Sequence, residues 1–324
     1  MEYRELGTTG QAVSVVGFGC WAMGGGWGAV DERDAVKAVH KALDLGINLF
    51  DTANIYGMGR SERLLAKALG PRRKDVVVAT KVGLHMDANG CIYRSGSRFH
   101  IMNAVEQSLK NLRTDYIDLY QIHWPDANTP LEETMRALEE LRSSGKVRFI
   151  GVSNFSLPQL KECLRWTRLD SNQPPFNMLM REFEKRELPF CRRNRIGVLT
   201  YGTLAYGLLT GKYNSKTRFP ANDWRSGKLF PDPGAWQRHI DLFQGENFRR
   251  NLRIVRKLKS WAKRRGATPG NVATAWVVAK RGVTSALVGA KNPAQVEENV
   301  RAAELKLTPS EVKELDRMIE AEGD

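Results

Sequence analysis

Short apolar segments alternate with longer amphipathic segments along almost the whole chain. Apolar runs of about four to eight residues are typical of buried strands, and apolar positions three and four apart are typical of helices. After a hairpin over residues 2–13, this pattern predicts strands at 14–20, 48–52, 76–81, 116–123, 147–152, 172–176, 197–201 and 284–288. It predicts helices at 31–45, 61–69, 103–112, 131–143, from 158, at 181–193, 247–265, 269–280, 293–302 and from 309, and a loop at 82–99.

Eight strands alternating with helices predict an α/β fold, a (β/α)8 TIM barrel with an N-terminal hairpin and long βα loops. A doubly wound sheet is the alternative, disfavoured because polar residues follow nearly every predicted strand, as the rim of a closed barrel would present them. Since barrels of this size occur as one unit, residues 1–324 are expected to form a single domain. The longest irregular stretch, 212–245, is rich in aromatic residues, and we expect it to form a lid over the barrel mouth.

Basic residues outnumber acidic ones, with 50 lysines and arginines against 36 aspartates and glutamates and a formal net charge of +14. Nine of the basic residues lie in 248–266 between apolar residues at helical spacing, which predicts an amphipathic helix with a solvated basic face. A nucleic-acid or membrane-surface role is a rival interpretation, disfavoured because no aromatic or groove-reading motif accompanies the charge. A basic surface also favours an anionic ligand such as a phosphorylated cofactor.

The sequence shows no sign of a targeting segment or a metal site. No stretch approaches the roughly 20 unbroken apolar residues of a membrane helix, and the N-terminus lacks the basic head and apolar run of a signal peptide. The cysteines (Cys20, Cys91, Cys163 and Cys191) show no CxxC spacing, which suits a reducing compartment. We therefore expect a cytoplasmic protein that binds no metal.

Four chemically active side chains lie at or just after the ends of consecutive predicted strands: Asp51, then Tyr56 on the following loop, Lys81 and His123. The carboxyl ends of barrel strands and the loops after them form the ligand-binding face, so we expect these side chains to meet there. Each also has a structural interpretation, namely a helix cap for Asp51, a half-buried tyrosine for Tyr56, a buried ion pair for Lys81 and a core histidine for His123.

Together these side chains have the chemistry needed to reduce a carbonyl group. Hydride addition to a C=O bond develops an oxyanion that must be hydrogen-bonded and then protonated. Tyrosine is a weak acid with a reference pKa of about 10, and a lysine ammonium beside it would stabilise its phenolate. Asp51 would hold Lys81 charged and oriented, and a neutral His123 could donate to the carbonyl oxygen and orient the substrate.

Six motifs agree in order and spacing with one family. They are Asp-Thr-Ala-x-x-Tyr-Gly-x-Gly-x-Ser-Glu at 51–62, Ala-Thr-Lys at 79–81, Leu-x-Thr-Asp-Tyr-Ile-Asp-Leu-Tyr-Gln-Ile-His at 112–123, Gly-Lys-Val-Arg-x-Ile-Gly-Val-Ser-Asn-Phe at 145–155, Gly-Leu-Leu-Thr-Gly-Lys-Tyr at 207–213 and Val-Gly-Ala-Lys-Asn-Pro-x-Gln-Val-Glu-Glu-Asn at 288–299. On these motifs the sequence resembles the aldo-keto reductases over nearly its full length.

The resemblance implies an NADP-dependent oxidoreductase that reduces an aldehyde or ketone to an alcohol, with Tyr56 as proton donor. Lys81 and Asp51 would tune that tyrosine, and His123 would orient the carbonyl group. The chain has no GxGxxG motif at a strand–helix turn, so a Rossmann-type site is not expected. Family members instead hold an extended nicotinamide dinucleotide, here NADPH or NADP+, across the barrel mouth.

The resemblance also implies a cofactor-binding set. Its members are Ser153, Asn154 and Gln173 at the carboxamide, Tyr201 stacked on the nicotinamide, Leu204 and the stretch from Gly207 to Lys212 at the pyrophosphate, Lys291 and Gln295 by the adenosine ribose, Glu298 and Asn299 at the adenine, and in addition Gly289. Lys291 is the residue that favours NADPH over NADH, because an ammonium there would pair with the 2′-phosphate. Its alternative is a solvent-exposed loop lysine, and Glu298 and Asn299 could equally face water.

Two segments depart from the pattern of the family. After Tyr201 the family often has Ser-Pro, whereas this chain has Gly202-Thr203. At 173–177 the chain reads Gln-Pro-Pro-Phe-Asn in place of a commoner Val-x-Tyr-Asn ending, which puts the path of the sixth predicted strand in doubt.

The substrate is expected under Trp21, Trp27 and Trp124, with the loops 82–99 and 212–245 around it. The alternative is that some of these tryptophans pack the loops onto the barrel. An aromatic mouth suits apolar or aromatic aldehydes, or small dicarbonyls held by Tyr56 and His123. A rival function is an NADPH-binding redox-sensing or regulatory subunit with slow turnover, similar to the aldo-keto-reductase-like subunits attached to ion channels. A complete set of catalytic side chains is compatible with both.

Overall fold

The computed structural model describes residues 1–25, 30–87, 89–221, 223–228 and 234–322. Eight parallel strands form a closed barrel in which each strand pairs with the next and the last pairs with the first. In chain order they are β3 (Val16–Gly19), β4 (Leu49–Asp51), β5 (Val77–Val82), β8 (Ile117–Ile122), β9 (Val147–Ser153), β10 (Ser171–Gln173), β11 (Gly197–Thr200) and β12 (Ser285–Gly289). The predicted (β/α)8 barrel is confirmed, and the doubly wound sheet is excluded.

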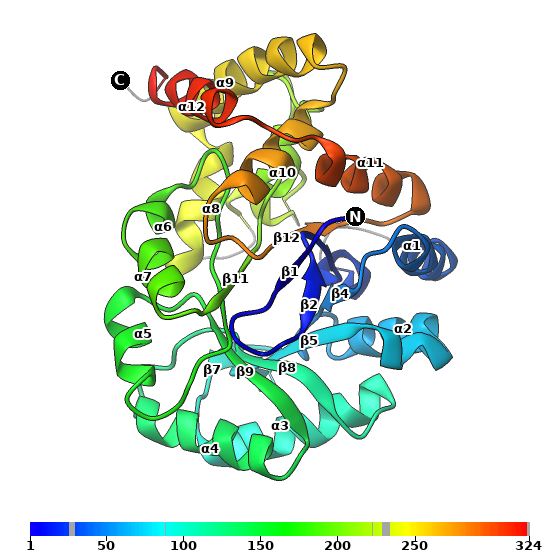
Figure 1. Ribbon diagram of the computed structural model, residues 1–324, viewed down its shortest axis with the longest axis vertical. Coiled ribbons are helices and arrows are strands. Elements are labelled where there is room, and N and C mark those ends of the chain that lie inside the picture. Colours follow the sequence, from blue (N-terminus) through cyan, green and yellow to red (C-terminus); the bar gives the residue numbers. More distant parts are fainter. Residues whose placement is uncertain (26–29, 88, 222, 229–233, 323–324) are drawn as a thin grey trace.

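Helices surround the barrel (Figure 1). They are α1 (Glu32–Asp44), α2 (Arg60–Leu69), α3 (Arg98–Leu112), α4 (Leu131–Ser143), α5 (Leu157–Cys163), α6 (Glu182–Lys185), α7 (Glu187–Arg193), α8 (Gln237–Ile240), α9 (Gly245–Arg264), α10 (Pro269–Ala279), α11 (Pro293–Glu304) and α12 (Pro309–Glu320). Short 3-10 helices are η1 (Trp21–Gly24), η2 (Gly70–Asp75), η3 (Ala205–Thr210), η4 (Trp224–Ser226), η5 (Gly234–Trp236) and η6 (Asp241–Phe243). The predicted N-terminal hairpin consists of β1 (Tyr3–Glu5) and β2 (Ala12–Ser14).

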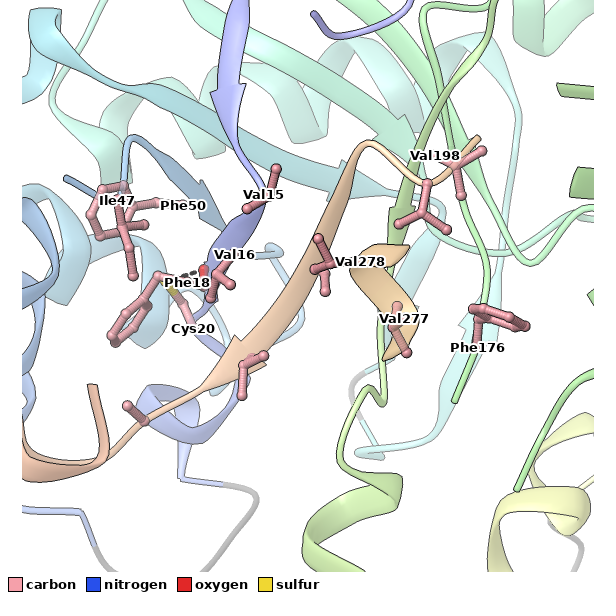
Figure 2. Packing of buried hydrophobic residues seen from close by; sticks show 14 of the residues in the cluster. Val15, Val16, Phe18, Cys20, Ile47, Phe50, Phe176, Val198, Val277 and Val278 are labelled. Carbon is pink, nitrogen blue, oxygen red and sulfur yellow. Dashed lines mark hydrogen bonds between the residues drawn. The ribbon is translucent and has the colours of Figure 1, made fainter. Parts of the chain in front are cut away.

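Successive residues of each strand face alternately the helices and the barrel interior. On β4, Phe50 packs in the outer core beneath the helices, whereas Leu49 belongs to an interior cluster. Figure 2 shows part of the outer core, where Phe18 and Phe50 lie close together, with ring centroids 5.6 Å apart. The interior cluster consists of Leu6, Val13, Leu49, Val77, Ala79, Leu119, Leu199 and Leu287.

The same alternation explains why polar side chains enter the barrel at one end. Two residues beyond Leu49, Ala79 and Leu119 come Asp51, Lys81 and Gln121, each of which is buried. The apolar cluster therefore fills the amino-terminal part of the interior, and a polar layer follows at the carboxyl ends of the strands. This is the end at which barrels bind their ligands.

Several boundaries differ from the predicted ones. β10 ends at Gln173, because Pro174 and Pro175 cannot donate ladder hydrogen bonds. The predicted loop 82–99 contains a hairpin of β6 (Leu84–Met86) and β7 (Ile92–Arg94), and α3 begins at Arg98, where Ser97 caps it by accepting from the His100 amide. The predicted helix 181–193 is divided into α6 and α7 at Arg186. The irregular stretch 212–245 contains η4, η5, α8 and η6.

The basic helix predicted at 248–266 is α9, which packs beside α12. Acidic residues neutralise part of its charge: Arg253 and Lys257 pair with Glu322, and Arg264 pairs with Glu314. The positive charge of the basic face is therefore partly neutralised within the fold. Among the described helices, none combines the length and the apolar character needed to cross a membrane.

Candidate active site

A buried ion pair joins the ends of β4 and β5. The Lys81 Nζ atom donates to Asp51 Oδ1 at 2.5 Å and to the Thr52 carbonyl oxygen at 2.9 Å. The Lys81 side chain is 1% exposed and that of Asp51 is 6% exposed. Lys81 is therefore a member of a buried ion pair with Asp51, which both its structural and its catalytic interpretation expect.

The second carboxylate oxygen of Asp51 is also occupied. The Gln173 Nε2 atom donates to Asp51 Oδ2 at 2.7 Å, and Gln121 Nε2 donates to the same oxygen at 3.4 Å. Sequence reasoning placed Gln173 at the cofactor and did not single out Gln121. The available signal was its position two residues before His123, which puts both side chains on the interior face of β8.

The ring of Tyr56 lies against both Lys81 and His123. The Lys81 Nζ atom is 5.2 Å from the Tyr56 ring centroid, and the His123 ring meets it edge-on at 5.7 Å. Burial raises the pKa of the Tyr56 phenol well above its usual value, and Asp51, Tyr201 and Cys20 add to this effect. The phenol therefore holds its proton at neutral pH, as a proton donor must.

The loop that carries Tyr56 is fixed by tight contacts at both ends. A Cβ atom at Gly57 would lie 2.3 Å from the Gly24 carbonyl oxygen, so only glycine lets this loop approach η1 so closely. At the end of the 51–62 motif, the Ser61 hydroxyl donates to the Cys20 carbonyl oxygen at 2.9 Å, and Glu62 accepts from the Thr80 hydroxyl at 2.7 Å. This buried serine and glutamate hold the loop in place.

His123 is buried, and the pKa of its imidazole is lowered well below the usual value by burial and by the nearby charge of Lys81. The ring is therefore neutral at physiological pH. Its Nδ1 atom has no hydrogen-bond partner among the described residues. A neutral imidazole carries one N–H donor, which suits it to a neutral oxygen acceptor.

A hydrogen-bond network continues from His123 across β9, β10 and β11. The Asn154 side chain donates to the His123 carbonyl oxygen at 2.9 Å and accepts from the Tyr201 hydroxyl at 2.8 Å. The Ser153 hydroxyl donates to the Gln173 carbonyl oxygen at 2.7 Å. Asn154 has a φ of 65°, a left-handed conformation that asparagine tolerates better than most residues. The residues predicted to bind a carboxamide therefore lie together beside Asp51 and His123.

The stretch predicted to bind a pyrophosphate begins at η3, just after Leu204. Ala205, Tyr206 and Gly207 have φ values of 44°, 56° and 91°, so the backbone coils tightly here. The Lys212 side chain folds back over Gly207, where a Cβ atom would lie 3.3 Å from Lys212 Nζ. The predicted residues Leu204, Gly207 and Lys212 are thus brought together.

A group of cations lies beside this stretch. Burial and the charge of Arg225 lower the pKa of Lys212, and burial together with Lys212 and Arg225 lowers the pKa of Lys291. Asp223 accepts from Arg225 at 2.5 Å and offsets part of the charge. Sequence reasoning identified Lys212 and Lys291 and missed Arg225, because nothing in the sequence of the 212–245 stretch places Arg225 near these two lysines.

The predicted adenosine contacts lie at the start of α11, and several make hydrogen bonds within the protein. Gln295 Oε1 accepts from the Lys291 amide at 2.8 Å, and Asn299 Nδ2 donates to the Gly289 carbonyl oxygen at 3.3 Å. Glu298 is exposed.

Aromatic rings cover Tyr56. Trp21 stacks on it with centroids 6.2 Å apart, and Trp21 also contacts Trp224 at 6.4 Å and Trp236 at 5.8 Å. Sequence reasoning named Trp21 as a pocket residue and gave the other two only as aromatic residues of the 212–245 stretch.

The other two predicted substrate residues have different outcomes. The guanidinium of Arg94 lies over the ring of Trp124, 4.8 Å from the ring centroid. This contact ties the β6–β7 hairpin to the residue after His123. Trp27 lies outside the described residues.

Comparison with known sequences gives one family over most of the chain. The profile of the "Aldo/keto reductase family" matches residues 15–320. "Aldo-keto reductase YhdN" of Bacillus subtilis is 39% identical, over 99% of this chain and 94% of its own length. "NADH-specific methylglyoxal reductase" of Escherichia coli is 35% identical over 99% of both chains. A "probable voltage-gated potassium channel subunit beta" of Arabidopsis thaliana is 34% identical over 99% of this chain and 97% of its own length.

Solved structures give the same result. The glycerol dehydrogenase AKR11B4 from Gluconobacter oxydans superposes with a TM-score of 0.88 at 38% identity, covering 99% of this chain and 95% of that one. An aldo-keto reductase from Klebsiella pneumoniae in complex with NADPH superposes with a TM-score of 0.74 at 26% identity, covering 98% of this chain and 96% of that one.

Proposed function

Because this chain belongs to the aldo/keto reductase family, we propose that it reduces an aldehyde or ketone to an alcohol with NADPH and catalyses the reverse oxidation with NADP+. The observation that carries the proposal is the buried Asp51–Lys81 pair beside Tyr56. A lysine with 1% side-chain exposure is costly to bury, and here it lies against a protonated phenol at the ligand-binding end of the barrel.

In this mechanism a bound nicotinamide would supply the hydride, and the protein supplies the proton and the hydrogen bonds. Tyr56 donates its phenolic proton to the oxygen of the carbonyl group as negative charge develops there. Lys81 stabilises the resulting phenolate by its charge, and Asp51 holds the ammonium in position. The neutral His123 ring donates its N–H to the same oxygen and fixes the orientation of the substrate.

The residues present fit a nicotinamide dinucleotide phosphate. Ser153, Asn154 and Gln173 would hold the carboxamide, and Tyr201 would stack on the nicotinamide ring. Burial lowers the pKa of Lys212 and Lys291, and the like charges of the group that they form with Arg225 lower it further, so an anion bound among them would relieve this repulsion. The phosphates of the cofactor supply such anions. Leu204, Gly207, Gly289, Gln295, Glu298 and Asn299 would complete the cofactor site.

We propose in addition that residues 212–245 act as a lid on the single barrel domain, 1–324. The contacts of Trp224 and Trp236 with Trp21 support this role, because they join the stretch to the ring that covers Tyr56. Trp124 would form another wall of the substrate pocket.

The experiment that tests the proposed function is NADPH oxidation measured against a panel of aldehydes, ketones and small dicarbonyls and repeated with NADH. Steady turnover supports the enzyme. The similarity to a potassium channel subunit favours one alternative, an NADPH-binding regulatory subunit. Tight NADPH binding with negligible turnover of every carbonyl compound in the panel would support that alternative and contradict the proposed enzymatic function.

The cofactor preference depends on Lys291 in this proposal. Lys291→Ala is expected to weaken NADPH binding about 10- to 100-fold, the effect of losing one hydrogen bond between charged groups, and to leave NADH binding within about 2-fold. Dissociation constants from fluorescence titration measure both. Lys306→Ala, which removes an exposed lysine paired with Glu2, is the charge-matched control. Equal losses of affinity for the two cofactors would contradict the role assigned to Lys291. The comparison with NADH is needed because one relative of this chain is named as NADH-specific.

The pH dependence of carbonyl reduction should differ from that of alcohol oxidation. Because the pKa of Tyr56 is raised and that of His123 is lowered, the protonated phenol and the neutral imidazole coexist throughout the neutral range. We therefore expect kcat/KM for reduction to stay nearly flat from about pH 6 to about pH 9. Alcohol oxidation needs the phenolate and should rise with pH over the same range. An acid limb near pH 6.5 that disappears in His123→Asn would show that the histidine titrates normally.

A further inference from the structure

Asp51 is held from the barrel interior by a second pair of side chains. Gln121 Nε2 donates to Asp51 Oδ2 at 3.4 Å, and Gln121 Oε1 accepts from the Ser171 hydroxyl at 3.2 Å. Gln121 and Ser171 are both 0% exposed. Since a carboxylate can only accept and a serine hydroxyl can donate, these two partners fix which end of the amide faces Asp51.

Gly151 makes room for this arrangement. A Cβ atom there would lie 2.1 Å from the Ser171 hydroxyl oxygen and 2.9 Å from Gln121 Cγ. Gly151 lies on β9, between the strands that carry Gln121 and Ser171, and it pairs with both residues in register. Any side chain at this position would displace the amide or the hydroxyl, so the barrel interior is shaped around this contact.

The two glutamines that reach Asp51 differ in what else they can bind. Gln173 lies beside Ser153 and Asn154 and is assigned to the cofactor carboxamide in the proposed function, so its amide serves two partners. Gln121 is fully buried and contacts Asp51 and Ser171. An apolar side chain would fill the same interior space without burying an amide, which indicates a role other than packing.

We propose that Gln121, oriented by Ser171, is a positioning residue that holds the Asp51 carboxylate against Lys81 whether or not the cofactor is bound. The inference rests on the proposed function, because its consequence is the transfer of the proton from Tyr56. Gln121 acts through Asp51 and Lys81. Its loss should therefore change the chemical step and its pH dependence, and leave the binding of substrate and cofactor unchanged.

Gln121→Met tests this, because methionine has a similar length and neither donates nor accepts strongly. We expect kcat for reduction to fall about 10- to 100-fold, with KM for the carbonyl substrate and the dissociation constant of NADPH within about 2-fold of wild type. Gln173→Met should differ by weakening NADPH binding as well. Gln107→Met, at an exposed position on α3, is the matched control and should change none of these quantities.

Gln121→Glu separates positioning from packing, because it keeps the shape of the side chain. Two carboxyl groups this close repel each other when both are ionised, which raises the pKa of one of them, so one is expected to keep its proton near about pH 6 and to lose it by about pH 8. When the carboxyl group introduced by this substitution is protonated, it can donate to Asp51 and accept from Ser171, as the glutamine does. We therefore expect its kcat to approach the wild-type value near about pH 6 and to fall about 10-fold or more by about pH 8.

Three outcomes would overturn the inference: a wild-type kcat and pH profile in Gln121→Met, a loss of kcat matched by a loss of NADPH affinity, or no recovery of Gln121→Glu on acidification. If Gln121→Met fails to fold, the pH response of Gln121→Glu decides the question. A wild-type protein that turns over no carbonyl compound would instead contradict the proposed function, so the two failures are distinguishable.

Discussion

Tyr56→Phe is expected to lower kcat for carbonyl reduction by about 100- to 10,000-fold, the usual contribution of a general acid. The phenylalanine ring keeps the contacts with Trp21, Lys81 and His123 and removes only the hydroxyl group. Binding of NADPH should stay within about 2-fold of wild type, because the proposed mechanism uses this hydroxyl group for proton donation alone. Steady-state kinetics and fluorescence titration of the same preparation measure the two quantities.

Tyr120→Phe is the matched control for this variant. Tyr120 is also buried, but it lies on β8 in the outer core, facing the helices. Its hydroxyl group should be dispensable for turnover, and activity should be retained. Wild-type rates in Tyr56→Phe would contradict the assignment of the proton donor. An equal loss in both variants would show that the effect comes from disturbed packing.

Strand alternation accounts for most of what the sequence could predict about the site. Asp51 and Lys81 each follow an apolar strand, and a period of two directs both into the barrel. Their contact follows from the barrel fold, because β4 and β5 are neighbours and Asp51 pairs with Ala79 in register. The position of each charged side chain at a strand end was therefore sufficient to predict that Asp51 and Lys81 contact each other.

Contacts between distant segments could not be predicted in the same way. Gln121 is an ordinary polar residue in sequence, and its role depends on Ser171, which lies 50 residues away on β10. The β6–β7 hairpin was predicted as a loop, because each of its strands has only three residues, too few to show a period. Arg225 joins Lys212 and Lys291 through the fold of the 212–245 stretch, which carries no repeating pattern.

The departure at Gly202-Thr203 has a structural reason. Gly202 has a φ of 66°, a left-handed conformation that serine and most other residues adopt only at a cost in energy. Asn177 donates to the Gly202 carbonyl oxygen at 2.9 Å, and the Thr203 hydroxyl donates to the Leu287 carbonyl oxygen at 2.9 Å. The turn after β11 is therefore tied to its neighbours by side chains at positions where the family often has Ser-Pro.

Lys81→Met is expected to abolish measurable turnover and to lower the free energy of unfolding by about 3 to 5 kcal/mol. The Asp51 carboxylate would remain buried with hydrogen bonds from Gln173 and Gln121 but without its counter-charge. Chemical denaturation measures the stability, and NADPH oxidation measures the turnover. Unchanged stability would contradict the ionic state assigned to the pair.

Two further variants separate stability from catalysis. Asp51→Asn combined with Lys81→Met removes both charges, so most of the stability should return while turnover stays absent. Lys280→Met is the matched control, because Lys280 is also buried and pairs with Glu184 and Asp316, but it precedes β12 at the amino-terminal end of the barrel. It should lose stability and keep kcat. If the double variant recovers turnover along with stability, the Asp51–Lys81 pair serves the fold and has no part in delivering the proton of Tyr56.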